Sequence, residues 1–194
     1  MHSAPTLPPT SLTDALRANT PLWEALHRLP DLGLPDWYLG GGCIAQTFWN
    51  HVCGMPPGQG ILDYDIVYFD PDLSREAERM AHERAETLLA DFGLTLDVKN
   101  QARVHLWYRD RFGYDIVPYR STCDAIATWP TTAGSVGVRV DEEGILSLSA
   151  PFTLDDLLHL VVRPNRAQVT RDVYDEKTAR WSRAWPRLVV LPWE

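Results

Sequence analysis

Two carboxylates and a run of three glycines are the residues of this chain whose types and spacing favour chemistry. Asp63 and Asp65 lie within the apolar, β-branched and aromatic stretch 61–69, which predicts a buried strand. Residues i and i+2 of a strand share a face and lie roughly 6.6 Å apart along it. Two ionised carboxylates about 5 Å apart repel each other by roughly 3 kcal/mol at an effective dielectric near 20. A divalent cation such as Mg²⁺ would remove that repulsion.

The glycines are Gly40, Gly41 and Gly42, which directly follow the apolar run 37–39. Glycine accepts positive φ and lets a ligand approach the backbone closely, and the amides of a following helix N-terminus bind anions. A tight strand-to-helix turn without a ligand has the same local pattern. Because the two acids follow downstream, we interpret the turn as a phosphate-binding one. No Gly-Lys-Ser/Thr follows and the Gly-x-Gly-x-x-Gly spacing is absent, which excludes a Walker-type loop and a Rossmann fingerprint.

This order of elements resembles the DNA polymerase β-like nucleotidyltransferase superfamily. It consists of a strand, a Gly-Gly turn into a helix, and a second strand with Asp-x-Asp. Within this superfamily, the chain is identified as a member of a small bacterial nucleotidyltransferase-like family that was formerly of unknown function. The segments that carry this resemblance are 41–44 with Trp49, 63–70, 98–105, 150–157 and 185–186. The resemblance implies a metal-dependent enzyme that transfers a nucleoside monophosphate from an NTP to a hydroxyl acceptor and releases pyrophosphate.

The resemblance also implies roles for single residues. Asp63 and Asp65 would bind the Mg²⁺ that bridges the nucleotide phosphates. A third carboxylate on the next core strand would bind a second metal ion and receive the proton of the attacking hydroxyl. Asp97 is favoured for this role, and Asp115 is the alternative. The residues expected to bind the nucleotide are Gly41, Gly42, Cys43, Lys99 and Arg103.

A row of basic residues near the C-terminus recurs at three- and four-residue steps and predicts a cationic stripe along one helix. Its members are Lys177, Arg180, Arg183 and Arg187. The stripe would contact an acceptor such as RNA, or it is a solvated face that balances an acidic protein. The solvated face is the favoured interpretation.

Composition narrows the class of protein. A chain of 194 residues fits one domain, and its hydrophobic fraction of 45% is ordinary for a soluble globular protein. The three cysteines are odd in number, which argues against a disulfide framework. No signal-peptide pattern or apolar span of membrane length is present, so we expect a cytoplasmic protein without a membrane partner. The net charge of −8 disfavours broad nucleic-acid binding, so a small molecule or a protein hydroxyl is expected as acceptor ahead of an RNA 3′ end.

Hydrophobic periodicity and turn signals predict an α/β (α+β) fold, a minimal polymerase-β-like core with a mixed sheet flanked by helices. Strands are expected at 37–39, 61–69 and 94–98, and a hairpin at 135–140 and 145–149. Helices are expected at about 11–19, 20–29, 44–52, 74–92, 100–112, 121–129, 153–162 and 170–186.

A single domain is expected over 11–187, with its core at about 37–120 and the hairpin and later helices appended at about 121–187. The proline-containing segment 1–10 is predicted to be a flexible tail, and 188–194 a C-terminal tail. The alternative to an enzyme is a catalytically inactive nucleotide-binding or protein-interaction module on the same fold.

Overall fold

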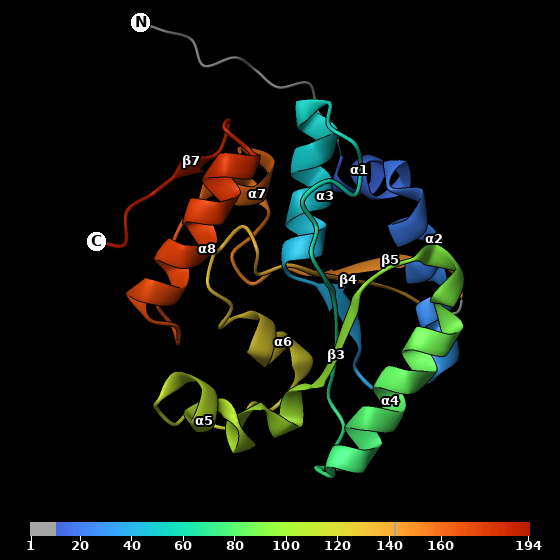
Figure 1. Cartoon of the computed structure of the whole chain (residues 1–194). Helices are drawn as coiled ribbons and strands as arrows, with labels where there is room; N and C mark the ends of the chain where they lie inside the picture. The colour runs from blue at the N-terminus through green and yellow to red at the C-terminus, as the bar shows by residue number, and fades with distance from the viewer. Residues whose placement is uncertain (1–10, 142) are drawn as a thin grey trace, which may run out of the picture.

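The computed structural model describes residues 11–141 and 143–194, and the predicted tail at 1–10 lies outside the described residues. The strands are Tyr38–Gly40 (β1), Tyr64–Tyr68 (β2), Leu96–Asn100 (β3), Gly137–Val140 (β4), Leu146–Ser149 (β5), Val161–Val162 (β6) and Val189–Val190 (β7) (Figure 1). The α-helices are Leu12–Ala18 (α1), Thr20–Arg28 (α2), Gly42–Cys53 (α3), Arg75–Leu88 (α4), Tyr108–Phe112 (α5), Thr122–Ile126 (α6), Asp155–Leu158 (α7) and Arg171–Ala184 (α8). The 3₁₀ helices of the described residues are Leu29–Leu32 (η1), Ala90–Phe92 (η2) and Gln101–Leu106 (η3).

The central element is a five-stranded sheet in the order β3-β2-β1-β4-β5. β2 and β3 run parallel, joined by the crossover helix α4, whereas the remaining neighbours are antiparallel. The predicted mixed α/β sheet flanked by helices is therefore confirmed. The predicted hairpin also forms, and its first strand pairs with β1 through Leu39 and Val138.

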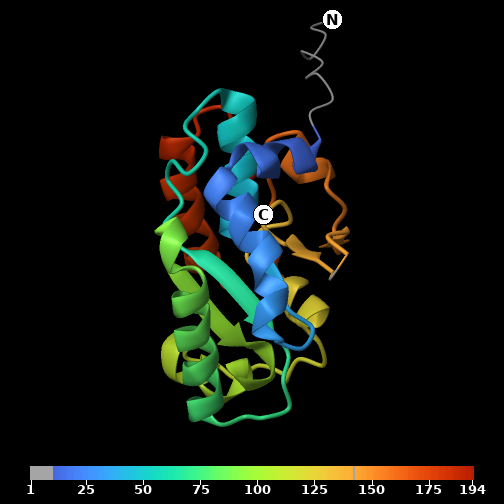
Figure 2. The ribbon, with the colours of Figure 1, turned by 90° about the vertical axis from the view of Figure 1, so that its right-hand side faces the viewer.

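The two faces of the sheet are covered differently. Leu39, Ile66 and Val98 point into the main core, which they share with apolar residues of α1 to α4. Tyr38 and Val67 point to the other face and pack against Ile126 and Trp129. Figures 1 and 2 show α2 and α4 on one side of the sheet and α6 and α8 on the other. Because side chains alternate along a strand, a residue two positions from Val67 also faces the α6 side.

Two predicted helices have different forms in the structure. The helix expected at 100–112 is divided into η3 and α5, and β3 extends to Asn100. The Asn100 Oδ1 atom accepts hydrogen bonds from the amides of Ala102 and Asp70, at 3.1 and 3.0 Å. These bonds fix a tight turn in place of a regular α-helical start. The helix expected at 153–162 ends at Leu158, and the chain then forms β6.

The segment 188–194, expected to be a C-terminal tail, contains a short strand. Val189 and Val190 form β7, which pairs in parallel with Val161 and Val162 of β6. A short apolar pair at a chain end carries a weak sequence signal, because its partner strand lies far away in the sequence. In the part of the chain that the structure describes, no helix combines the length and apolarity needed to cross a bilayer.

Candidate active site

The glycine turn joins β1 to α3 and lies against the first candidate carboxylate. Gly41 has φ 73° and ψ −135° at the start of α3, a conformation that favours glycine. A Cβ atom on Gly41 would lie 3.1 Å from the Oδ2 atom of Asp65, and one on Gly40 would lie 2.7 Å from the Trp129 ring. The glycines therefore allow a carboxylate on one side and an aromatic ring on the other to approach the backbone.

Asp65 and Asp97 lie side by side on neighbouring strands. They are register partners in the parallel pair β2–β3, and both line one cavity. Asp63 lies one residue before β2 and is exposed, so the expected strand does not include it. Asp115, the alternative third carboxylate, lies apart on the surface in an ion pair with Arg109 at 2.9 Å. The structure thus brings Asp97, rather than Asp115, next to Asp65.

The ionised form of Asp65 is disfavoured in the absence of a bound cation. Burial raises the pKa of Asp65 to about 7, and the negative charge of Asp63 contributes to the increase. Lys177 lowers the pKa of Asp65, whereas Asp97 raises it. The cluster therefore carries negative charge that nearby lysines compensate only in part.

Lysines approach the carboxylates from two elements. The Nζ atom of Lys99, on β3, lies 2.5 Å from Oδ1 of Asp97. Lys177, on α8, lines the same cavity, and its Nζ atom lies 4.9 Å from the centroid of the Trp181 ring. Burial lowers the pKa of Lys177, and the attraction of Asp65 opposes this shift. Lys177 thus adds a second lysine, besides Lys99, to the cavity that contains the carboxylates.

Lys177 is a site residue that the sequence prediction assigned only to the stripe on α8. Of the four stripe residues, Lys177 lines the cavity, and Arg187 instead donates from Nη1 to the Val52 carbonyl at 2.9 Å. A signal was available in the sequence. Lys177 is three residues after Tyr174 and four before Trp181, so it shares the apolar face of the helix.

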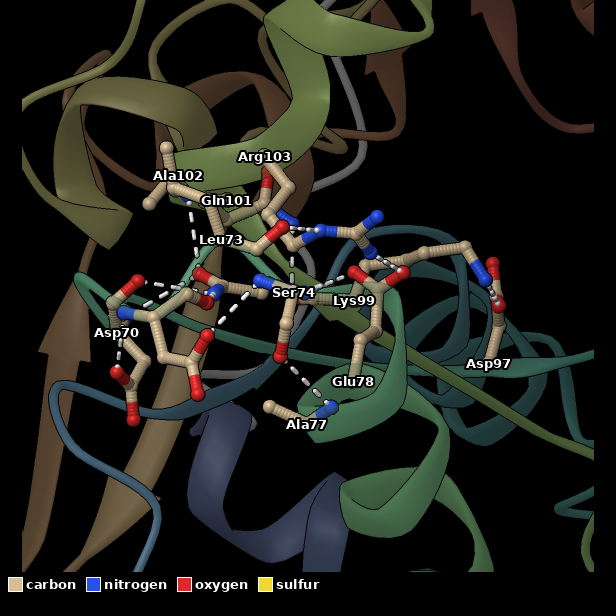
Figure 3. A network of polar contacts seen from close by, with 12 residues as sticks. Asp70, Leu73, Ser74, Ala77, Glu78, Asp97, Lys99, Gln101, Ala102 and Arg103 are labelled. Atoms are coloured by element: carbon tan, nitrogen blue, oxygen red, sulfur yellow. Dashed lines mark hydrogen bonds and ion pairs between the residues drawn. The ribbon is translucent and has the colours of Figure 1, made fainter.

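Arg103 and Cys43, both predicted to bind the nucleotide, have side chains that are engaged elsewhere. The Arg103 guanidinium forms a buried ion pair with Glu78, and its Nε atom donates to the Leu73 carbonyl at 2.9 Å (Figure 3). These contacts fasten η3 to the first turn of α4. The Cys43 thiol is buried and donates to the Gly40 carbonyl at 3.2 Å, and burial raises its pKa well above the ordinary value. If Cys43 binds a nucleotide, its backbone amide rather than its side chain makes the contact.

The donor set at the carboxylates fits Mg²⁺. Asp65 and Asp97 offer hard oxygen ligands whose charges oppose each other. Mg²⁺ is usually held by one or two carboxylates together with substrate phosphates, rather than by a complete protein cage. Within 11–141 and 143–194, no group of three or more His, Cys, Asp or Glu residues is placed to hold a metal ion, so the expected ligands Asp63, Asp65 and Asp97 are not gathered as a set of three.

The carboxylates open into a cavity of about 1010 Å³. Gly41, Gly42 and Lys177 form its wall near Asp65, and the side towards α6 includes Trp129. Tyr119 and Gln168 also line the cavity, and the sequence prediction did not include them. The Nε2 atom of Gln168 donates a hydrogen bond to the Tyr119 hydroxyl at 2.6 Å. A volume of this size is at the upper end for a small-molecule site and leaves room for more than a triphosphate.

Comparisons with known proteins agree with this architecture. The sequence model of a family described as Nucleotidyltransferase matches residues 27–190. A solved NMR structure described as a CCA-adding enzyme head domain is similar to this chain, with a TM-score of 0.76 and 26% sequence identity. The similarity covers 93% of this chain and 94% of that one. None of the curated proteins searched matches the chain.

Proposed function

Since the chain belongs to the nucleotidyltransferase family whose model matches residues 27–190, we propose that it is a magnesium-dependent enzyme. It transfers a nucleoside monophosphate from an NTP to a hydroxyl acceptor and releases pyrophosphate. The observation that carries the proposal is the register pairing of Asp65 with Asp97 directly beside the Gly41 turn. We place the protein in the cytoplasm, in agreement with its free cysteines Cys43, Cys53 and Cys123.

The carboxylates and the turn have separate roles in this proposal. Asp65 and Asp97 would hold Mg²⁺, which when bound neutralises charge on the phosphates, and the charge of Asp63 acts on Asp65. The amides that follow Gly41, together with Lys177, hold the triphosphate. Lys99 is proposed as a further phosphate contact, whereas Arg103 holds η3 against the first turn of α4 through its buried ion pair with Glu78.

The transfer step forms one bond and breaks one. The acceptor hydroxyl oxygen bonds to the α-phosphorus of the NTP, and the bond from that phosphorus to the leaving pyrophosphate breaks. The proton of the hydroxyl passes to Asp97, which lies next to Asp65 in the sheet. The Nζ atom of Lys99 lies 2.5 Å from Oδ1 of Asp97 and helps to position this carboxylate.

The acceptor is a small molecule, a protein hydroxyl or an RNA 3′ end. The similar NMR structure is described as a head domain of a CCA-adding enzyme, which keeps the RNA end among the candidates. The alternative function is a catalytically inactive nucleotide-binding or protein-interaction module. The engagement of Arg103 with Glu78 favours this alternative, because it reduces the cationic charge available to a triphosphate.

A thermal-shift titration with ATP, GTP, CTP and UTP, with and without Mg²⁺, tests the proposal. The wild type is compared with Asp65→Asn. At 100 times the dissociation constant, a ligand stabilises the fold by about 2.7 kcal/mol. We expect Mg²⁺-dependent stabilisation by at least one NTP and its loss in the variant. Absence of any shift, or an equal shift in Asp65→Asn, would contradict the proposed site. Transfer activity with the stabilising NTP then separates an enzyme from an inactive module.

A further inference from the structure

Arginine residues line part of the cavity, although the whole protein carries a net charge of −8. They come from α4 and from the segment of η3 and α5, and the ion pair between Arg103 and Glu78 holds these two parts together. We call this region the arginine wall, and its basic residues are Arg75, Arg79, Arg103 and Arg111. Its acidic member is Glu78.

Two of these arginines have their charge compensated by the protein itself. Arg79 forms ion pairs with Glu76 and Glu83, and Arg103 forms one with Glu78. Within the described residues, Arg75 and Arg111 form no ion pair. Both are exposed and line the cavity. They are therefore the guanidinium groups of this wall that remain available to an anionic ligand.

Arg75 stands where a cation is unfavourable for the helix. It is the first residue of α4, next to the Ser74 cap, at the positive end of the helix dipole. A cation at that end of a helix is destabilising, because it is repelled by the positive end of the dipole. The positive charge of Arg75 does not stabilise α4, whereas a bound phosphate would interact favourably with both Arg75 and the positive end of the helix dipole.

Aromatic residues of the same segment of the chain also line the cavity. They are Trp107, Tyr108 and Phe112. The Trp107 and Tyr108 rings are stacked with centroids 6.1 Å apart, and the Arg111 guanidinium lies 5.6 Å from the Phe112 centroid. Guanidinium groups interleaved with aromatic faces suit a ligand that carries both a phosphate and a planar base.

We propose that the arginine wall binds the acceptor, and that the acceptor is a nucleotide with a free hydroxyl. This inference rests on the proposed function. Arg75 and Arg111 hold a phosphate of the acceptor, and Trp107 stacks on its base. Held there, the acceptor lies in the same cavity as Asp65 and Asp97 and as the triphosphate contacts of Lys177 and the glycine turn. A free mononucleotide and the 3′ end of an RNA share this chemistry.

Binding in the presence of a blocked donor tests the proposal without depending on turnover. The donor site is first saturated with Mg²⁺ and the α,β-methylene analogue of the NTP that stabilises the protein most. Titrations with the mononucleotides and with a short single-stranded RNA bearing a free 3′ hydroxyl then measure the acceptor site. The wild type is compared with the double variant Arg75→Ala/Arg111→Ala, with Trp107→Leu and with Trp107→Phe. Arg109→Ala, a change at an exposed residue of α5 that does not line the cavity, is the matched control.

We expect at least tenfold weaker binding of the nucleotide probe in the double variant and in Trp107→Leu, and near wild-type binding in Trp107→Phe and Arg109→Ala. Binding of a mononucleotide supports a free nucleotide acceptor, and binding of RNA alone supports an RNA end. If neither probe binds, or if the double variant binds as tightly as the wild type, the proposal is overturned. The thermal shift by Mg²⁺ and NTP is recorded on the same samples. If it persists while the acceptor probes fail, the proposed function stands and only the acceptor site falls.

Discussion

At the scale of single residues, Asp65 makes the stability of the metal-free protein depend on pH. Its pKa is raised from an ordinary 3.8 to about 7 in the folded state. The folded protein therefore binds more protons than the unfolded chain between these values, and stability falls as the pH rises through that window. We expect Asp65→Asn to stabilise the metal-free protein by about 2–4 kcal/mol at pH 8 and by much less at pH 5, from about 1.4 kcal/mol per pKa unit.

Chemical denaturation at both pH values measures this effect in the presence of a chelator. Asp115→Asn is the matched control, because Asp115 is an exposed carboxylate paired only with Arg109, and it should give no pH-dependent gain. A stabilisation by Asp65→Asn that is equal at pH 5 and pH 8 would show that the carboxylate is not held in an unfavourable ionised state.

Lys177 supports a second prediction at the residue scale. It lines the cavity beside Asp65 and Gly41, so we expect it to contact the triphosphate. Lys177→Met should weaken binding of the Mg²⁺–NTP complex by at least tenfold, or about 1.4 kcal/mol, because it removes a charge-assisted contact. Calorimetric titration of the variant gives the affinity. Arg183→Ala changes a charge on the same helix outside the cavity and should leave the affinity unchanged. Equal losses in both variants would indicate a general electrostatic effect instead.

At the scale of elements, the turn between β1 and α3 depends on glycine. Gly41 has φ 73°, and a Cβ atom there would crowd the Asp65 carboxylate. Gly41→Ala should cost about 1–3 kcal/mol of stability and should also weaken NTP binding, since it displaces the turn from Asp65. Thermal melts and NTP titrations measure the two effects. Gly58→Ala is the control, because nothing lies within 4 Å of its Cβ position and its φ is not positive. If Gly41→Ala melts at the wild-type temperature, the turn does not require glycine at this position.

The elements that could be predicted from the sequence are those with a local cause. The start of α4 at Ser74, whose hydroxyl accepts from the Ala77 amide at 3.2 Å, follows from a capping residue before a helix-forming run. The hairpin of β4 and β5 follows from alternating apolar residues around a turn. The interruption after Asn100 was not predicted, because it depends on a side chain that also binds Asp70 on another segment.

At the scale of the whole molecule, the site joins parts of the chain that no local pattern connects. Asp65 and Asp97 could be placed together from the resemblance, since consecutive strands of a crossover unit usually pair. The position of Lys177 could not be predicted in this way, because it depends on how α8 packs against α3. The Trp181 ring meets the Trp49 ring of α3 at a centroid distance of 4.9 Å, and the Trp185 Nε1 atom donates to Asn50 at 2.7 Å. The cavity and its arginine wall likewise exist only after the helices have packed.

The last residues of the chain hold the other end of α8. The Tyr174 hydroxyl lies 2.6 Å from the Leu191 carbonyl, and the Leu191 amide donates to the Val162 carbonyl at 2.9 Å. The Trp193 ring also packs on Tyr174, at a centroid distance of 5.7 Å. Since Tyr174 is one helical turn before Lys177, we infer that the C-terminal segment fixes the lysine that faces the carboxylates.

Removal of residues 189–194 should therefore lower both the melting temperature and the affinity for the Mg²⁺–NTP complex, although none of these residues lines the cavity. Loss of the β6–β7 pairing and of the packing on Tyr174 should cost about 2–4 kcal/mol, by comparison with other losses of buried contacts. Removal of residues 193–194 alone keeps β7 and the Leu191 contacts, so it should have a smaller effect on both quantities.

A shortened protein that melts at a lower temperature but binds the nucleotide normally would mean that the tryptophan contacts with α3 are sufficient to position Lys177. A loss of affinity that is restored by adding the 189–194 peptide would show that docking of the C-terminal segment, rather than the covalent end of the chain, holds the site in place.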